Sequence, residues 1–317
     1  MPAWRMLTSD TLVFSRLSST FRFTIQMLLP LIFASVLGLA APTQGSTVDS
    51  AINDRVLFQQ LENATAALAQ KDENRLKRDT RLEQCKRPTT GNLHLPAQQN
   101  VILLGDEIYR RAAAASVLIG SAYKCEKCTK WHNSLASGFI ISPDGVIATN
   151  HHVAASATGE AMGVMTADGK FHQVLEVLAA DKDHDVALIR IGARGLPFLP
   201  LRDDAPAGSA IRCYSNPANT YGCISQGIIT RYFHMNDTDR NGAIFMQTTA
   251  DYARGSSGGA IIDEFGNAVG MVASTSPVFT ASPAHNVATK DAKPTPPSQQ
   301  MVRHNCATAR AILDLQK

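Results

Sequence analysis

The sequence carries little charge, and neither sign dominates it: 18% of its 317 residues are Asp, Glu, Lys or Arg, and the net charge is +3. A charge this small and dispersed is not the electrostatic footprint of a nucleic-acid-binding protein. The chain also lacks a glycine repeat, a sustained heptad pattern and a composition poor in hydrophobic residues, which make up 44% of it. These absences exclude a collagen, a coiled-coil rod and a fully disordered chain, and leave an ordinary globular protein.

Residues 23–41 contain no charged residue, and three arginines precede them. A basic segment, an apolar run and an exit through small residues, Gly38 and Ala40, predict an export signal that is cleaved after Ala40. The run is also nearly long enough to span a bilayer, so an uncleaved membrane anchor is the alternative. Either interpretation predicts an exported protein, periplasmic or secreted, and the style of the signal favours a bacterial source.

Six cysteines follow this segment, and an even number in an exported protein predicts disulfides. Cys125 and Cys128 form a C-x-x-C motif, which occurs in redox pairs, tight disulfides and zinc sites. His132 could be a third zinc ligand, but the sequence offers no evident fourth. A disulfide or a pair of surface thiols is therefore favoured, and neither a metal nor another cofactor is predicted. Position along the chain suggests two further pairs, Cys213 with Cys223 and Cys85 with Cys306.

Helical patterns flank the central part of the chain. Residues 48–84 repeat apolar side chains at helical spacing and predict an amphipathic helix within an N-terminal extension, residues 41–96. The heptad pattern breaks, so a coiled coil is disfavoured. Residues 299–316 have a similar spacing and predict a C-terminal helix.

Between the helical segments, short apolar runs alternate with turn residues, which is typical of an all-β barrel or sandwich. Turn signals at Pro143–Gly145, Asp168–Gly169 and Gly266–Asn267 predict hairpins. A break at 206–208 separates two sets of strands. The pattern predicts two barrels, at about 112–203 and about 207–290, within a domain that spans residues 97–317.

Three polar segments stand at the ends of expected strands or in the adjoining loops: ATNHHVAA at 148–155, DKDHDVALIRI at 181–191 and TTADYARGSSGGAIID at 248–263. A serine nucleophile needs a base within hydrogen-bond reach and a carboxylate that fixes the tautomer of that base. It also needs backbone N–H donors at a sharp, glycine-rich turn to stabilise the oxyanion. Taken singly, each segment has a plainer interpretation as a flexible loop, a core histidine or the start of a strand.

Together, the three segments resemble the T-N-x-H-V, D-x-A-v-L and G-N-S-G-G motifs of trypsin-like serine proteases, particularly the HtrA (DegP-like) branch. The resemblance covers roughly residues 112–315 and implies two six-stranded antiparallel barrels with the active site between them. It makes His152 the general base, Asp185 the carboxylate that orients the base, and Ser257 the nucleophile. The N–H groups of Gly255 and Ser257 would form the oxyanion hole.

The chain also departs from the pattern. No PDZ domain fits into the residues after Ser274, and Ser256 stands where digestive trypsins have an Asp before the nucleophile. Asp251 occupies the position at which trypsins select basic side chains, or else it faces solvent or pairs with Arg254. The strand containing Ser274 and Thr275 would hold an extended peptide by β-augmentation.

The sequence thus predicts an exported serine endopeptidase acting on polypeptides. The alternative is a non-catalytic module on the same fold that binds peptides or acts like a chaperone. An oligomer is compatible with either prediction, and membrane association is expected only if the N-terminal segment is uncleaved.

Overall fold

The structure is a computed structural model that describes residues 51–71, 73–91, 93–125, 127–235, 240, 242–279 and 298–317. The predicted export signal, residues 1–40, lies outside the described residues. No helix in the described ranges is long and apolar enough to cross a membrane.

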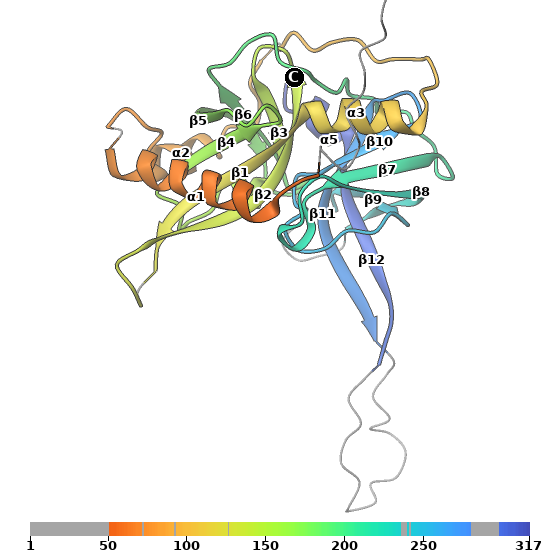
Figure 1. The fold of residues 1–317 in the computed structure, drawn as a ribbon. Helices are drawn as coiled ribbons and strands as arrows, with labels where there is room; N and C mark the ends of the chain where they lie inside the picture. Colours follow the sequence, from red (N-terminus) through yellow and green to blue (C-terminus); the bar gives the residue numbers. More distant parts are fainter. Residues whose placement is uncertain are drawn as a thin grey trace, which may run out of the picture. The chain divides into compact units, whose positions relative to one another are not determined.

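The first barrel is closed and antiparallel, with its six strands in the order β1-β2-β3-β6-β5-β4 (Figure 1). Strand β1 closes it by pairing with both β2 and β4. The bounds of the strands are β1 Ser116–Lys124, β2 Trp131–Ser142, β3 Val146–Thr149, β4 Ala161–Thr166, β5 Phe171–Asp181 and β6 Val186–Ile191.

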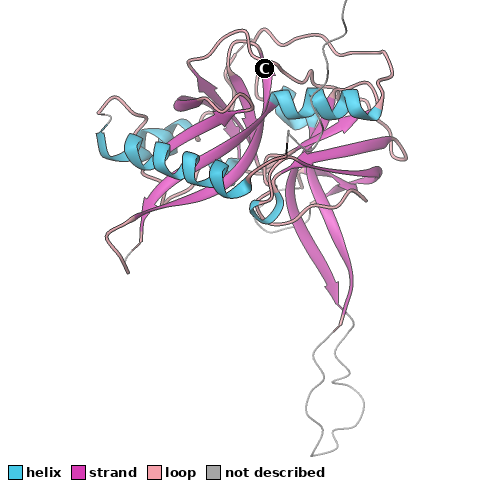
Figure 2. Ribbon diagram, viewed as in Figure 1, coloured by secondary structure: helices cyan, strands magenta, loops and turns pink. Residues whose placement is uncertain are grey.

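The second barrel has six strands in the order β10-β11-β12-β9-β8-β7 and is also closed. Its closing strand is β12, which pairs with both β11 and β9. Strands β11 and β12 run on together beyond the rest of this barrel (Figures 1 and 2). The bounds are β7 Ala210–Ser215, β8 Cys223–His234, β9 Ile244–Thr248, β10 Ala260–Asp263, β11 Ala268–Phe279 and β12 Gln299–Thr308.

The prediction of an all-β fold with two six-stranded barrels is confirmed, and so are the three hairpin turns. Gly145, Gly169 and Gly266 have φ values of 82°, 77° and 81°, which glycine adopts without the penalty that a side chain would bring. The prediction of one helix over 299–316 was wrong in its first half. Residues 299–308 form β12, because the barrel closes only when a sixth strand pairs with both free edges, and α5 covers only Ala309–Asp314.

The N-terminal extension also differs from the single predicted helix. It contains α1, Asp54–Lys71, and α2, Arg78–Gln84. Leu61, Thr65 and Leu68 of α1 are buried, and the helix packs against β1 and β4 of the first barrel. A third helix that the sequence analysis missed, α3 at Gly105–Ala115, precedes β1. The short α4, His151–Ala154, and a 3-10 turn, Pro217–Asn219, complete the helical segments of the described residues.

The barrels share a hydrophobic core. One cluster unites Phe139 and Leu188 of the first barrel with Ile262 and Met271 of the second, and Ile108 of α3 joins them. Each of these side chains is at most 1% exposed. Burying a side chain of this size contributes about 1.5–3 kcal/mol. The two barrels are therefore fixed to each other by packing, which allows residues from both to form one site.

The structure does not show the predicted disulfides: all six cysteines are free. Cys85 packs in the core of the first barrel and Cys306 in that of the second, so these two cannot pair. Cys213 lies opposite Ser225 across the β7–β8 ladder, whereas Cys223 lies opposite Ser215. Strand register separates Cys213 from Cys223, and packing in different barrel cores separates Cys85 from Cys306; position along the chain reveals neither.

Candidate active site

His152 and Asp185 meet at one end of the first barrel. Asn150 is the N-cap of α4 immediately after β3, and His152 lies in that helix. The His152 Nδ1 atom is 2.9 Å from Asp185 Oδ2 and 3.0 Å from Oδ1. The carboxylate can only accept, so Nδ1–H donates and Nε2 is left as the free acceptor. This tautomer is the one that a general base requires.

The position of Asp185 is fixed by its backbone as well as by its side chain. The residue has a φ of 56°, a left-handed conformation that Asp tolerates better than most residues. The Asn150 Nδ2 atom donates to the Asp185 carbonyl at 2.9 Å, and the His152 backbone N–H donates to the carboxylate at 3.0 Å. The Asp185 side chain is only 4% exposed, whereas that of His152 is 50% exposed. The imidazole therefore faces accessible space while its partner is buried.

Two other histidines lie nearby but differ in their contacts. Burial lowers the pKa of His151, which has no hydrogen bond to Asp185 among the described residues. His184 pairs with Asp181 at 2.7 Å, and this hydrogen bond raises the pKa of His184. Of the three His–Asp pairs in the described residues, only that of His152 and Asp185 has a buried carboxylate and a half-exposed ring.

The Ser257 loop is shaped by glycines of the second barrel. Gly255 and Gly258 have φ values of 98° and 86°. A Cβ atom on Gly258 would lie 2.0 Å from the Ser137 carbonyl oxygen, so no side chain fits there. Ser256 is fully buried and accepts a hydrogen bond from the Ser215 hydroxyl at 3.0 Å, whereas Ser257 is partly exposed. The loop therefore presents Ser257, and not Ser256, at the surface.

Hydrogen bonds through Ser137 attach this loop to the first barrel. The Ser137 N–H donates to the Ser257 carbonyl at 2.7 Å, and its hydroxyl donates to the Gly255 carbonyl at 3.3 Å. Its own carbonyl accepts from Thr149 Oγ1 at 3.0 Å, three residues before His152. The Asn216 Nδ2 atom donates to the Ser137 hydroxyl at 2.9 Å. These contacts bring the serine segment to the strand that leads into His152.

The groups that catalysis would use are free in this arrangement. Within the described residues, no hydrogen bond joins the Ser257 hydroxyl to the His152 ring. The backbone N–H groups of Gly255 and Ser257 have no acceptor there either. Catalytic hydrogen bonds often tighten only when substrate is bound.

An open pocket of about 440 Å³ adjoins the serine loop. Asp251 lies at its edge, and its side chain is 93% exposed. The Asp251 Oδ1 atom is 3.9 Å from His304 Nε2. No ion pair between Asp251 and Arg254 occurs in the described part of the chain. Asp251 could select basic side chains, pair with Arg254 or face solvent, and the last of these three alternatives matches the geometry. The pocket is lined by Asp251, Tyr252, Ala253, Arg254, Thr275, Val302 and His304.

The two predicted strand residues differ in their roles. Thr275 is exposed and lines the pocket. The Ser274 hydroxyl accepts from Asn305 Nδ2 at 3.4 Å, and its carbonyl accepts from the Tyr252 hydroxyl at 3.2 Å. Residues 274–278 pair with β12 on one edge, and among the described residues no strand pairs with the other edge. That free edge can accept an extended peptide.

Sequence analysis missed Arg240, which reaches from the segment between β8 and β9 to the first barrel. Its Nη2 atom is 3.9 Å from Asp185 Oδ2, and its guanidinium lies over the Phe245 ring, 5.1 Å from the centroid. Asp185 therefore lies between a cation and the imidazole. Arg240 belongs to no motif and lies 55 positions after Asp185, so the local sequence pattern does not predict this contact.

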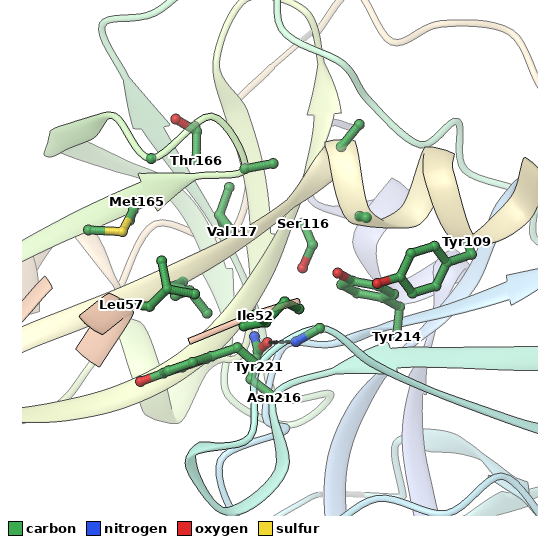
Figure 3. A pocket seen from close by; sticks show the side chains of 16 residues that line it. Ile52, Leu57, Tyr109, Ser116, Val117, Met165, Thr166, Tyr214, Asn216 and Tyr221 are labelled. Carbon is green, nitrogen blue, oxygen red and sulfur yellow. Dashed lines mark hydrogen bonds between the residues drawn. The ribbon is translucent and has the colours of Figure 1, made fainter. Parts of the chain in front are cut away.

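A separate apolar pocket of about 290 Å³ contains none of the predicted catalytic residues (Figure 3). Tyr109 and Tyr214 stand edge to face in it, with ring centroids 5.7 Å apart, near Ser116. Ile52 and Leu57 line it from the N-terminal side. Its lining is hydrophobic and offers no nucleophile paired with a base.

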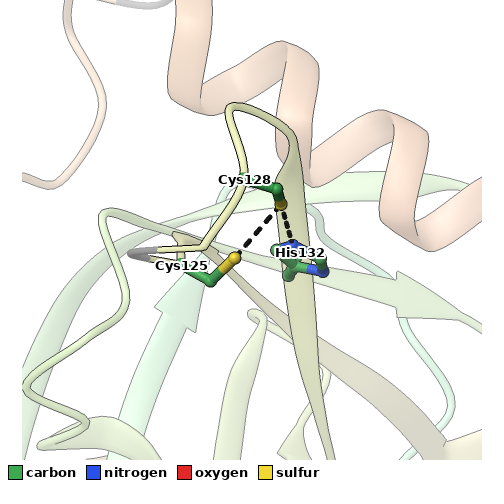
Figure 4. A group of neighbouring side chains, drawn as sticks. All are labelled: Cys125, Cys128 and His132. Atoms are coloured by element: carbon green, nitrogen blue, oxygen red, sulfur yellow. Dashed lines mark hydrogen bonds between the residues drawn. The ribbon is translucent and has the colours of Figure 1, made fainter.

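The C-x-x-C motif lies in the loop that joins β1 to β2, outside this site. The Cys125 and Cys128 sulfurs are 3.1 Å apart, and the Cys128 sulfur is 2.9 Å from His132 Nε2 (Figure 4). The hydrogen bond from Cys128 lowers the pKa of Cys125 to about 7. By contrast, burial raises the pKa of Cys85 and of Cys306, the latter to about 12. Cys125 is therefore an accessible cysteine whose pKa lies near neutral pH, unlike the buried Cys85 and Cys306.

The family described as trypsin-like peptidase domain matches residues 136–271. The chain is 34% identical over 172 residues to the serine endoprotease DegS of Escherichia coli K12, covering 51% of this chain and 46% of DegS. It is 34% identical over 151 residues to a probable periplasmic serine endoprotease, DegP-like, of Pseudomonas fluorescens, covering 47% of this chain and 30% of that protein. The match spans less than half the length of these curated relatives.

Solved structures show the same fold. The HtrA-type protease AlgW with a decapeptide superposes with a TM-score of 0.50 and 22% identity, covering 66% of each chain. A variant of that protease with a tripeptide gives a TM-score of 0.51 at 22% identity, covering 67% of this chain and 62% of that one.

Proposed function

We propose, from the premise that this chain contains a trypsin-like peptidase domain related to the HtrA-type serine proteases, that it is a serine endopeptidase. The observation that carries the proposal is the His152–Asp185 pair, with Nε2 free, beside a glycine turn at positive φ that presents Ser257. Relatives with the same domain are named serine endoproteases.

In the proposed mechanism, the Ser257 hydroxyl attacks the carbonyl carbon of the scissile peptide bond while His152 Nε2 takes its proton. Asp185 holds the ring and stabilises the imidazolium that forms. His152 then gives the proton to the leaving amine, and water hydrolyses the acyl-enzyme by the same route. The free N–H groups of Gly255 and Ser257 would stabilise the oxyanion, each by about 3 kcal/mol. We expect bound substrate to draw the Ser257 hydroxyl onto the imidazole.

The substrate that the site favours is an extended polypeptide paired with the free edge of β11 near Ser274 and Thr275. Main-chain pairing of this kind tolerates many sequences. Asp251 is too exposed to act as a buried floor charge, so we expect no strong selection for Lys or Arg. Export to the bacterial periplasm is part of the proposal, supported by the N-terminal segment and by the DegP-like relative, which is named a probable periplasmic protease.

The proposal is tested by labelling the full chain with a fluorophosphonate and by measuring cleavage of a denatured protein. Wild type should be labelled at Ser257, and both Ser257→Ala and His152→Ala should lose turnover by roughly 10⁴-fold or more. Ser209→Ala, in the turn before β7, is the matched control and should be unaffected.

The competing function is a non-catalytic module that binds peptides. Wild-type protein that binds the denatured substrate, stays unlabelled and never cleaves it would establish the module and exclude the peptidase.

A further inference from the structure

The hairpin between β1 and β2 brings three ligating side chains together. Cys125 and Cys128 lie in the loop, and His132 is the second residue of β2, where pairing with Tyr123 fixes its backbone. Their sulfur and nitrogen atoms all lie within 4.8 Å of one another, and Figure 4 shows the three side chains converging. No other group of three such ligands occurs in the described part of the chain.

The distances fit a metal better than they fit an isolated thiol pair. A tetrahedral zinc ion with Zn–S of about 2.3 Å and Zn–N of about 2.0 Å separates its ligand atoms by about 3.5–3.8 Å. The observed separations of 3.1 Å and 2.9 Å need to widen by only about 0.7 Å, which side-chain rotation can supply. A Cys125–Cys128 disulfide would leave the approach of His132 Nε2 to the Cys128 sulfur without a role, whereas a metal uses all three groups.

The surroundings of the cluster suit a soft cation that enters from solvent. Cys128 is exposed, and Cys125 and His132 are partly exposed. Lys127 and Lys130 stand exposed in the same loop, so the cluster lies at the protein surface. Two thiolates and a neutral imidazole are ligands that select zinc over magnesium or calcium.

We propose that Cys125, Cys128 and His132 form a zinc site that cross-links the loop to strand β2. The three protein ligands leave the fourth coordination position to water. The site is separate from the Ser257 groove, and the proposal does not depend on peptidase activity.

The test uses the full chain, reduced, stripped of metal and titrated with Zn²⁺ against a chromogenic chelator. We expect one ion per chain, and Co²⁺ in its place should give a sulfur-to-metal charge-transfer band. Cys125→Ser, Cys128→Ser and His132→Gln should each weaken binding by more than about 100-fold. Cys223→Ser and His172→Gln are the matched controls and should bind as wild type does.

Circular dichroism of each variant separates loss of ligand from loss of fold, and His132→Gln leaves the thiols in place. Reduced wild type that binds Zn²⁺ no more tightly than the Cys125→Ser/Cys128→Ser double variant would overturn the proposal. Formation of a Cys125–Cys128 disulfide in the presence of one equivalent of Zn²⁺ would overturn it equally.

Discussion

The two barrels hold their parts of the candidate active site in different ways. The first barrel fixes Asp185 and His152 through side-chain hydrogen bonds, including that of the Asn150 amide. The second barrel fixes Ser257 through backbone conformation, with Gly255 and Gly258 at positive φ. The part of the site on the first barrel should therefore lose activity when a polar group is removed. The Ser257 loop of the second barrel should lose stability when a side-chain atom is added.

Of the variants that test this difference between the barrels, Asp185→Asn in the first barrel should have the largest effect. An amide of the same shape can hold the imidazole in the wrong tautomer, so kcat/KM at neutral pH should fall about 10⁴-fold while the fold persists. Asp181→Asn, in the neighbouring His–Asp pair, should leave kcat/KM within a few-fold of wild type. Equal losses in the two variants would mean that the buried pair has no special role.

An intermediate effect is expected from Gly258→Ala in the second barrel. The added Cβ would meet the Ser137 carbonyl oxygen at 2.0 Å, so the free energy of unfolding should fall by about 2–5 kcal/mol. Gly169→Ala is the matched control, because its φ is 77° and nothing lies within 4 Å of its Cβ. It should cost only about 1–2 kcal/mol in a denaturant titration. Similar losses in both variants would contradict a clash at Gly258.

The smallest effect concerns His184, whose pKa is raised by the hydrogen bond to Asp181. A pKa that is higher in the folded state stabilises the protein below the unfolded pKa of about 6.5, and this stabilisation is lost as pH rises through the folded pKa. Wild type should exceed His184→Gln in free energy of unfolding by a few tenths to about 1 kcal/mol near pH 5, with little difference near pH 8. A stability difference that grew with pH would refute this assignment.

The sequence predicted the features that depend on residues close together in the chain, such as turns and strands. Glycine in the turns at Gly145, Gly169 and Gly266 marked the hairpins, because those turns need positive φ. Two barrels followed from the alternation of strands and turns. The roles of His152, Asp185 and Ser257 stay predictions that await the experiments above.

What the sequence did not reveal depends on contacts between distant segments. Residues 299–308 have an apolar spacing that suits a helix. They form β12 instead, because they pair with the free edges of both β11 and β9. Asn216 bonds to Ser137 across 79 positions, and the Ser137 hydroxyl reaches Gly255 across 118. Small polar residues at such separations carry no periodic signal. The helix α3 was missed because its four alanines merge into the apolar run of β1.

Barrel closure has a practical consequence for the limits of the folding unit. The family match begins at Ala136, inside β2, and ends at Met271, inside β11. Both closing strands, β1 and β12, therefore fall outside it. A protein excised at those limits would expose unpaired strands in each barrel, a template for self-association. Recombinant versions should instead start before α1 and run through α5.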